Sequence, residues 1–257
     1  MPPALLALMI QSAFRVTFER ESLRLAFCLG VVPSIVSLIV AHGAIALFDL
    51  EGESGLVAAV LGTMVGLALA IPFAVKAGGD LLARVLDRPP VVSPAVATRR
   101  AFLVLGQIIA LLAALGVLLG VAEGLFPGAL VNPVVMLVAA GGFLYLATGF
   151  VFGPVLAFFG ETVDPRRSFA LVKGSRAKLF AFLMVVGLPF VMASNFISSI
   201  ALAQPDSALV LAVIVALVAG FVGGLSYAPH LVGLTQAYFA LNGAPPPTLN
   251  TAAGPRT

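Results

Sequence analysis

The sequence predicts an all-α, polytopic membrane protein: a six-helix transmembrane bundle with short amphipathic helices at the membrane surface. Hydrophobic residues make up 61% of the chain and charged residues only 10%, and the mean hydropathy is +1.14. Soluble domains are about half apolar and about a quarter charged, so this chain has too few charges to cover a water-facing surface. The apolar residues also fall in blocks of roughly 20, the length that crosses a bilayer as a helix.

The first 24 residues form the first predicted element. No basic segment precedes the apolar run Ala4–Ile10 and no clear small-residue cleavage site follows it, so a signal peptide is not expected. Phe14, Phe18 and Leu25 recur at the spacing of one helix face. These positions predict an amphipathic helix on the membrane surface. The alternative is a cytoplasmic extension of the first span.

Residues 1–242 are predicted to form one transmembrane domain. Pro89 and Pro90 end the polar helix that continues from the second span, and Gln204–Ser207 is a turn short enough to make the next helix antiparallel. The segment 243–257 is predicted to be a disordered tail. The six spans are expected at about 25–48, 56–75, 101–121, 134–159, 179–203 and 208–229.

The distribution of charge predicts the orientation. In a six-span arrangement all 14 Lys and Arg residues fall on one side of the membrane, and the opposite side holds only acids. Because basic residues are retained in the cytoplasm, both termini are expected there. The net charge of +3 is explained by this asymmetry, and no nucleic-acid partner is expected.

Prolines in the even spans suggest a repeat of three hairpins. Pro72, Pro154 and Pro229 stand near the predicted cytoplasmic ends of spans two, four and six. Pro33 and Pro189 are a matching pair in spans one and five. Three hairpins of one orientation would be related by a pseudo-threefold axis along the membrane normal. The alternative is chance, because prolines are common in membrane helices and span three has none.

Pairs of glycines four residues apart are the second packing signal. Such pairs let helix backbones approach closely in lipid. They suit packing within the bundle, with oligomerisation as the alternative. The pairs are Gly62/Gly66, Gly116/Gly120 and Gly220/Gly224.

The sequence offers little chemistry. An ionisable residue at mid-membrane depth usually marks a membrane enzyme or pump, and none is predicted here. His42 and His230 fall at opposite faces of the membrane, and Cys28 is the only cysteine, so no metal, cofactor or disulfide is expected. Lys76 and Asp80, four residues apart, are interpreted as a local ion pair.

The segment between spans four and five is predicted to be a basic platform. Asp164 is a suitable N-cap, Pro165 suits the first helical position, and Gly174 ends the short helix. Phe169 and Val172 are expected to dip into the membrane surface while basic side chains contact anionic headgroups. The expected lipid-contacting residues are Arg166, Arg167, Lys173, Arg176 and Lys178.

Two alternatives stay open for this platform. Glu161 is the other candidate partner for the two arginines of the first turn, whose charge opposes the helix dipole. The basic loop would otherwise serve only to orient the chain in the membrane.

The segment Phe150–Phe182 resembles a family of six-span bacterial inner-membrane proteins without an assigned activity, similar to the membrane domain fused to some glycerophosphodiester phosphodiesterases. The resemblance rests on Pro154, then Glu161, then Ser168–Leu171 and Gly174, followed at once by a span. It implies a bacterial inner-membrane location. The chain lacks the tryptophan common near this segment and any fused catalytic domain, so phosphodiesterase activity is not carried over.

The predicted function is a non-enzymatic inner-membrane protein acting as a structural, accessory or regulatory component. Its expected partners are membrane lipids, anionic on the cytoplasmic leaflet, and a further membrane protein. The alternative is a transporter or channel for a lipid or small apolar solute, in which proline-broken spans gate a cavity.

Overall fold

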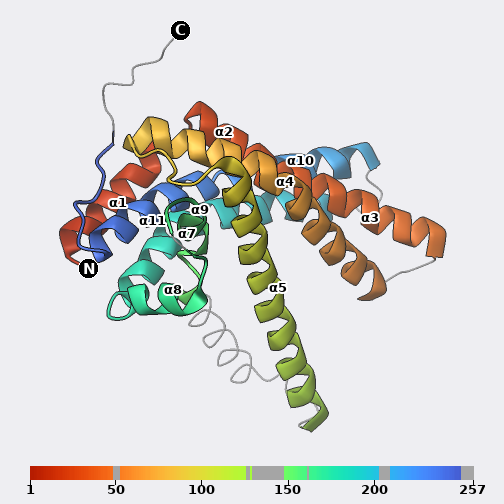
Figure 1. Ribbon diagram of the computed structural model, residues 1–257. Coiled ribbons are helices and arrows are strands. Elements are labelled where there is room, and N and C mark those ends of the chain that lie inside the picture. Colours follow the sequence, from red (N-terminus) through yellow and green to blue (C-terminus); the bar gives the residue numbers. More distant parts are fainter. Residues whose placement is uncertain (49–52, 126–127, 129–147, 161, 203–208, 250–257) are drawn as a thin grey trace.

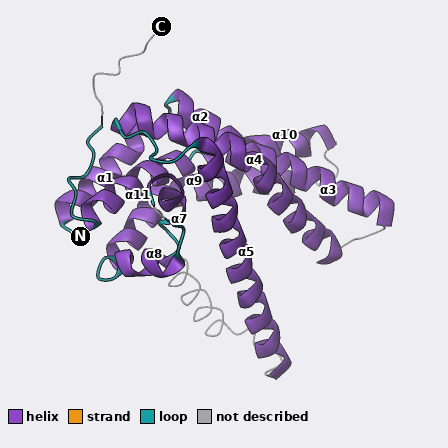
Figure 2. Ribbon diagram, viewed as in Figure 1, coloured by secondary structure: helices purple, strands orange, loops and turns teal. Residues whose placement is uncertain are grey.

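The computed structural model describes residues 1–48, 53–125, 128, 148–160, 162–202 and 209–249. Every regular element within these ranges is a helix, which confirms the all-α class (Figures 1 and 2). Five helical stretches in these ranges are long and apolar enough to cross a membrane, as a membrane protein requires. They are Arg20–Gly43, Val57–Leu86, Pro94–Leu125, Arg176–Ser199 and Val213–Leu241.

The elements follow the predicted order, with two additional interruptions. Span one begins as α2, passes through a π-helical turn, η1, and continues as α3. The segment predicted as span six breaks between α10 and α11. The bounds are α1 Pro3–Val16, α2 Arg20–Ala26, η1 Phe27–Val31, α3 Val32–Phe48, α4 Glu53–Leu86, α5 Pro94–Leu125, α7 Gly153–Phe159, α8 Pro165–Val172, α9 Arg176–Leu202, α10 Leu209–Gly224 and α11 Tyr227–Leu241.

Small residues bring α3 and α4 together in the first hairpin. A Cβ added at Gly66 would lie 2.5 Å from the Cα of Pro33, so the two backbones touch there. Near Gly62, the hydroxyl of Ser37 donates to the carbonyl of Ala59 at 2.7 Å. This glycine pair therefore serves packing within the bundle, as the first of the two alternatives predicted.

A second close seam joins span one to α10. A Cβ at Gly30 would meet the carbonyl oxygen of Gly220 at 2.0 Å, and one at Gly224 would meet the carbonyl oxygen of Ala26 at 2.4 Å. In contrast, nothing described lies within 4 Å of a Cβ added at Gly116 or Gly120. These two glycines lie on α5, which projects away from the other helices (Figure 1).

The best-packed part of the molecule is where α1, α7 and α11 meet the adjoining halves of α4 and α9, and we call it the packed end. Here α11 is enclosed on most of its faces, and ten of its residues are buried. The described Lys and Arg side chains of α4 and of the start of α9 belong to this end. Its largest fully buried apolar side chains are Met9, Leu81, Leu82, Phe152, Leu156, Leu179 and Phe182.

The N-terminal helix packs against the rest of the protein along one face. Leu5, Met9 and Val16 of α1 are buried, and this face packs on α9 and α11. Phe14 and Phe18, which were predicted to face the membrane, are 48% and 75% exposed. The helix is therefore a structural part of the packed end, and its contact with the membrane surface stays a prediction. Its two exposed phenylalanines remain accessible to lipid.

The predicted disordered tail also differs from the structure in its first part. Pro247 is buried, and its carbonyl accepts a hydrogen bond from the side chain of Gln236 at 2.9 Å. Leu249 packs against the core. The segment 243–249 is thus docked on α11. Residues 250–257 lie outside the described residues.

The three repeat prolines occupy different settings. Pro72 lies inside the continuous helix α4. Pro154 is at the start of α7, after the non-helical residues 150–152, so the described end of predicted span four is not one helix as expected. Pro229 lies in the first turn of α11, after the turn at 225–226. The middle hairpin falls largely on 129–147, outside the described residues, so the repeat stays a prediction.

Candidate functional site

The predicted basic platform forms a short helix, α8, with the expected caps. The carboxylate of Asp164 accepts a hydrogen bond from the backbone N–H of Arg166 at 2.9 Å, and Pro165 occupies the first turn. Gly174 has φ +78°, a conformation that favours glycine, and it ends the segment. Ser175 stands directly before α9. The local signals for this element are therefore confirmed.

The apolar face of α8 turns toward the protein. Val172 is fully buried in the core. Phe169 packs on Gly149 and meets the ring of Phe150 edge-on, with centroids 5.5 Å apart. The expectation that Val172 dips into the membrane surface is therefore wrong, because this side chain is buried in the core. For Phe169, which is half-buried, the expectation stays a prediction.

The five basic residues of the platform divide into two groups. Arg166 and Lys173 are exposed, and Arg167 is half-buried. The guanidinium of Arg176 lies over the ring of Phe169, 5.4 Å from its centroid. The ammonium of Lys178 donates to the backbone carbonyl of Met1. Arg166 and Lys173 are thus the members most open to an external anion.

Two long-range contacts fix the platform to the rest of the packed end. The amino group of Met1 donates to the hydroxyl of Ser175 at 3.2 Å. Arg100 of α5 donates to the carbonyl of Gly160, where α7 ends. Glu161, the predicted alternative partner of the platform arginines, lies outside the described residues.

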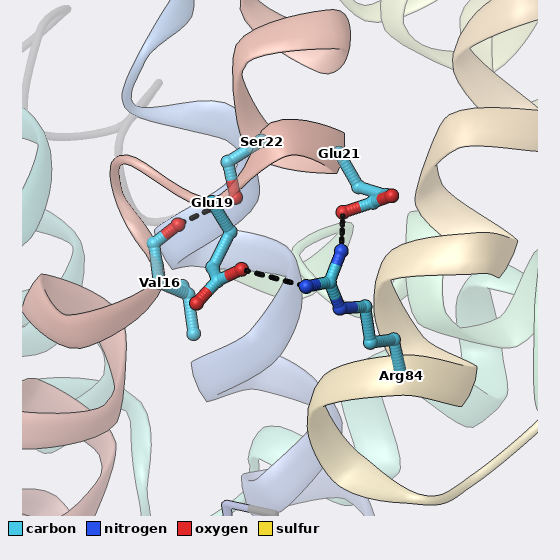
Figure 3. A network of polar contacts seen from close by, with 5 residues as sticks. All are labelled: Val16, Glu19, Glu21, Ser22 and Arg84. Carbon is cyan, nitrogen blue, oxygen red and sulfur yellow. Dashed lines mark hydrogen bonds and ion pairs between the residues drawn. The ribbon is translucent and has the colours of Figure 1, made fainter. Parts of the chain in front are cut away.

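An ion-pair network joins α2 to α4 (Figure 3). Arg84 reaches Glu21 at 3.1 Å and Glu19 at 3.9 Å. The hydroxyl of Ser22 donates to the carbonyl of Val16 at 2.5 Å and so fixes the corner between α1 and α2. Glu21 is buried, and its charge is compensated within the protein. The sequence offered no signal for this network, because its partners stand 63 residues apart.

A buried amide joins the N-terminal and C-terminal parts of the chain. The side-chain nitrogen of Gln236 donates to the hydroxyl of Ser12 at 3.0 Å and to the carbonyl of Pro247. Both side chains are almost completely inaccessible to solvent. The oxygen of the Gln236 amide has no hydrogen-bond partner in the described part of the chain. This amide thus serves packing rather than ligand binding.

Lys76 and Asp80 do not form the predicted ion pair. The ion pairs among the described residues that involve α4 are those of Arg84. Lys76 and Asp80 instead line a cavity of about 230 Å³ between α4, the connector 87–93 and Phe158. The backbone N–H of Val91 donates to the carbonyl of Phe158 at 3.1 Å and holds the connector there.

The histidines have local partners. His42 contacts the carbonyl of Leu38 at 2.9 Å, and His230 contacts the carbonyl of Leu183 at 3.3 Å. The ring of Phe182 meets His230 edge-on. Within the described residues, no group of three or more His, Cys, Asp or Glu side chains is arranged to hold a metal ion.

The candidate site is therefore the surface of the packed end, with two exposed basic side chains on α8 and a buried polar interior that joins helices. Comparison with known proteins adds no assignment: no family model, curated protein or solved structure matches this chain.

Proposed function

We propose that this chain is a non-enzymatic integral protein of a bacterial inner membrane, acting as a structural, accessory or regulatory component. The observation behind this proposal is the use of the buried polar groups at the packed end. Glu21 is neutralised by Arg84, and Gln236 bonds to Ser12 and Pro247. These groups hold helices together, and the exposed charges are left for contacts outside the molecule.

In this proposal the packed end faces the cytoplasm. The positive-inside rule supports that orientation, since the described basic residues gather there. Arg166 of α8 and Lys173, directly after it, are exposed cations of the predicted platform. They offer contacts to anionic headgroups or to an acidic surface of a membrane-protein partner. The six-span plan, the hairpin repeat and the resemblance to phosphodiesterase-fused membrane domains belong to the same proposal.

The second candidate is a transporter or channel for a lipid or small apolar solute. It is supported by the breaks at 150–152 and 225–226, each followed at once by a short helix with proline in its first turn. Non-helical backbone within a span is tolerated where it is buried in protein or lines a cavity. The motion that a gate requires would act at these breaks.

Copurification from native membranes separates the two candidates. The full chain is isolated in mild detergent and analysed by native mass spectrometry for bound proteins, lipids and solutes. A stoichiometric protein partner supports the accessory role, and a solute or lipid retained in an interior cavity, without a protein partner, supports transport.

Charge variants then locate the contact surface. Arg166→Gln/Lys173→Gln should lose the partner if α8 is the docking surface. The control variant Arg15→Gln/Arg99→Gln removes the same number of charges from exposed positions on α1 and α5. This control should still bind the partner. Loss of the partner in both double variants would mean that total charge, and not α8, recruits it.

A further inference from the structure

A groove lies on the surface between the start of span one and α10. Its volume is about 410 Å³, and it is shallow and widely open to the surroundings. The lining side chains are predominantly apolar, with two arginines among them. The lining residues are Arg20, Leu23, Arg24, Phe27, Cys28 and Phe221.

The two arginines belong to one edge of this groove. Arg20 and Arg24 are one helical turn apart, so their side chains share a face of α2. Both are exposed, and neither forms an ion pair with any residue of the described chain. The neighbouring acids, Glu19 and Glu21, point to Arg84 of α4 (Figure 3). The edge of the groove therefore carries two uncompensated positive charges.

The same two segments, the start of span one and α10, also meet at a close backbone seam. The backbones touch at Gly30 and Gly220, and again at Ala26 and Gly224. No chain can pass between the helices there, so the groove is a slot along the surface and not a tunnel. The π-helical turn η1 lies directly beneath the arginines and supplies Phe27 and Cys28 to the lining. Turns of this kind often mark functional sites.

We propose that this groove binds one anionic phospholipid. The guanidiniums of Arg20 and Arg24 hold the headgroup phosphate, whose oxygens match their planar N–H donors. One acyl chain lies along the slot against Phe27, which is exposed, and Phe221, which is half-buried. This site is separate from α8, and it stands whether or not the proposed accessory function is correct.

The slot distinguishes this site from ordinary contact between basic residues and the membrane surface. Arg15 and Arg99 are equally exposed, but neither lines this groove. A free phosphate or soluble phosphate ester would use only the arginines and leave the apolar part of the slot empty. A diacyl phospholipid contacts both parts, and it is the ligand class with matching chemistry along the whole groove.

Cys28 supplies a direct readout, because it is the only cysteine in the chain and it lines the slot. The full chain is reconstituted in zwitterionic nanodiscs with increasing fractions of phosphatidylglycerol. The rate at which N-ethylmaleimide alkylates Cys28 is then measured. Bound lipid should slow alkylation, so the phosphatidylglycerol fraction for half-maximal protection reports affinity.

Removing both guanidinium charges should weaken protection strongly. In Arg20→Gln/Arg24→Gln, the phosphatidylglycerol fraction that gives half-maximal protection of Cys28 should rise about 30-fold. Each arginine near an anionic lipid contributes a factor of roughly five to the affinity, and the two factors multiply. The matched control, Arg15→Gln/Arg99→Gln, should change it less than twofold. Glycerophosphate added in solution should not protect Cys28 in any variant.

Three results would overturn the proposal. Unchanged protection in the Arg20/Arg24 variant would remove the headgroup site. Equal protection by phosphatidylcholine alone would remove the preference for anionic lipid. Protection by glycerophosphate would assign the arginines to a soluble phosphate. If the double variant fails to fold, the single variants Arg20→Gln and Arg24→Gln and the variant Phe221→Ala test the proposal instead. Each of the three must weaken the protection of Cys28 by phosphatidylglycerol, and Arg15→Gln/Arg99→Gln must not.

Discussion

The ion-pair network of Arg84 predicts an asymmetric response to mutation. Arg84→Met leaves Glu21 without its partner, and the Glu21 side chain is only 11% exposed. Removing one partner of a buried ion pair lowers the free energy of unfolding by about 3–5 kcal/mol. Because the Glu21 side chain keeps some exposure, we expect a loss of about 3 kcal/mol for Arg84→Met. Glu21→Gln leaves Arg84, whose side chain is 35% exposed and still 3.9 Å from Glu19. Water and Glu19 stabilise that charge, so we expect a cost of about 1 kcal/mol.

The double variant Glu21→Gln/Arg84→Met tests the same reasoning. This variant leaves no unpaired charge at positions 21 and 84. It should therefore lower the free energy of unfolding by about 1.5 kcal/mol, well below the sum of the losses in the two single variants. Unfolding by dodecyl sulfate in mixed micelles, followed by circular dichroism, measures each value. Arg99→Met, at an exposed position, is the control and should stay within about 0.5 kcal/mol of the parent. Equal costs for the two single variants, or additive costs in the double, would refute the account.

Three further results are expected. Gly30→Ala should lower the free energy of unfolding by about 1–3 kcal/mol in the same micelle assay, because the added methyl group would meet a backbone carbonyl. Gly116→Ala, the control, should be neutral or stabilising by up to about 1 kcal/mol. Equal effects of the two substitutions would contradict the close contact at Gly30. Gln236→Leu should release segment 243–249 and speed its proteolysis, and an unchanged cleavage rate would show that the amide does not hold it. Reporter fusions after Arg88 should be cytoplasmic and those at Gly128 periplasmic; a reversal at either would overturn the six-span topology.

Local signals explain which parts of the fold could be predicted from the sequence. Pro89 ended its helix where expected, since α4 stops at Leu86. Asp164 and Gly174 bounded α8 because capping and positive φ depend on residues close in the chain. The glycines at 62 and 66 were recognised as packing positions for a similar reason, because small size is visible in the sequence itself.

The remaining features depend on contacts distant in the chain. The buried face of α1 could not be chosen from its own sequence, because both faces of that helix carry apolar residues and α11 decides which is covered. The docking of Pro247 depends on Gln236, and the charge of Glu21 depends on Arg84. At the candidate site, the short helix was predicted, whereas the inward direction of Phe169 was not. Gly149, which receives that ring, gives no sign of this role in the sequence.

The contact between α1 and α11 has a consequence for biogenesis. Ser12 and Gln236 are 224 residues apart, so at about 5–20 residues per second the ribosome needs roughly 10–45 s to supply the partner of a helix made first. During that interval Leu5, Met9 and Val16 lack α11, one of the two helices on which this face packs in the folded protein. We expect the part of this face that α11 covers to contact the bilayer or an insertion factor until α11 is made. The contact between α1 and α11 therefore forms late, and assembly of the packed end waits until residues 227–241 have been synthesised.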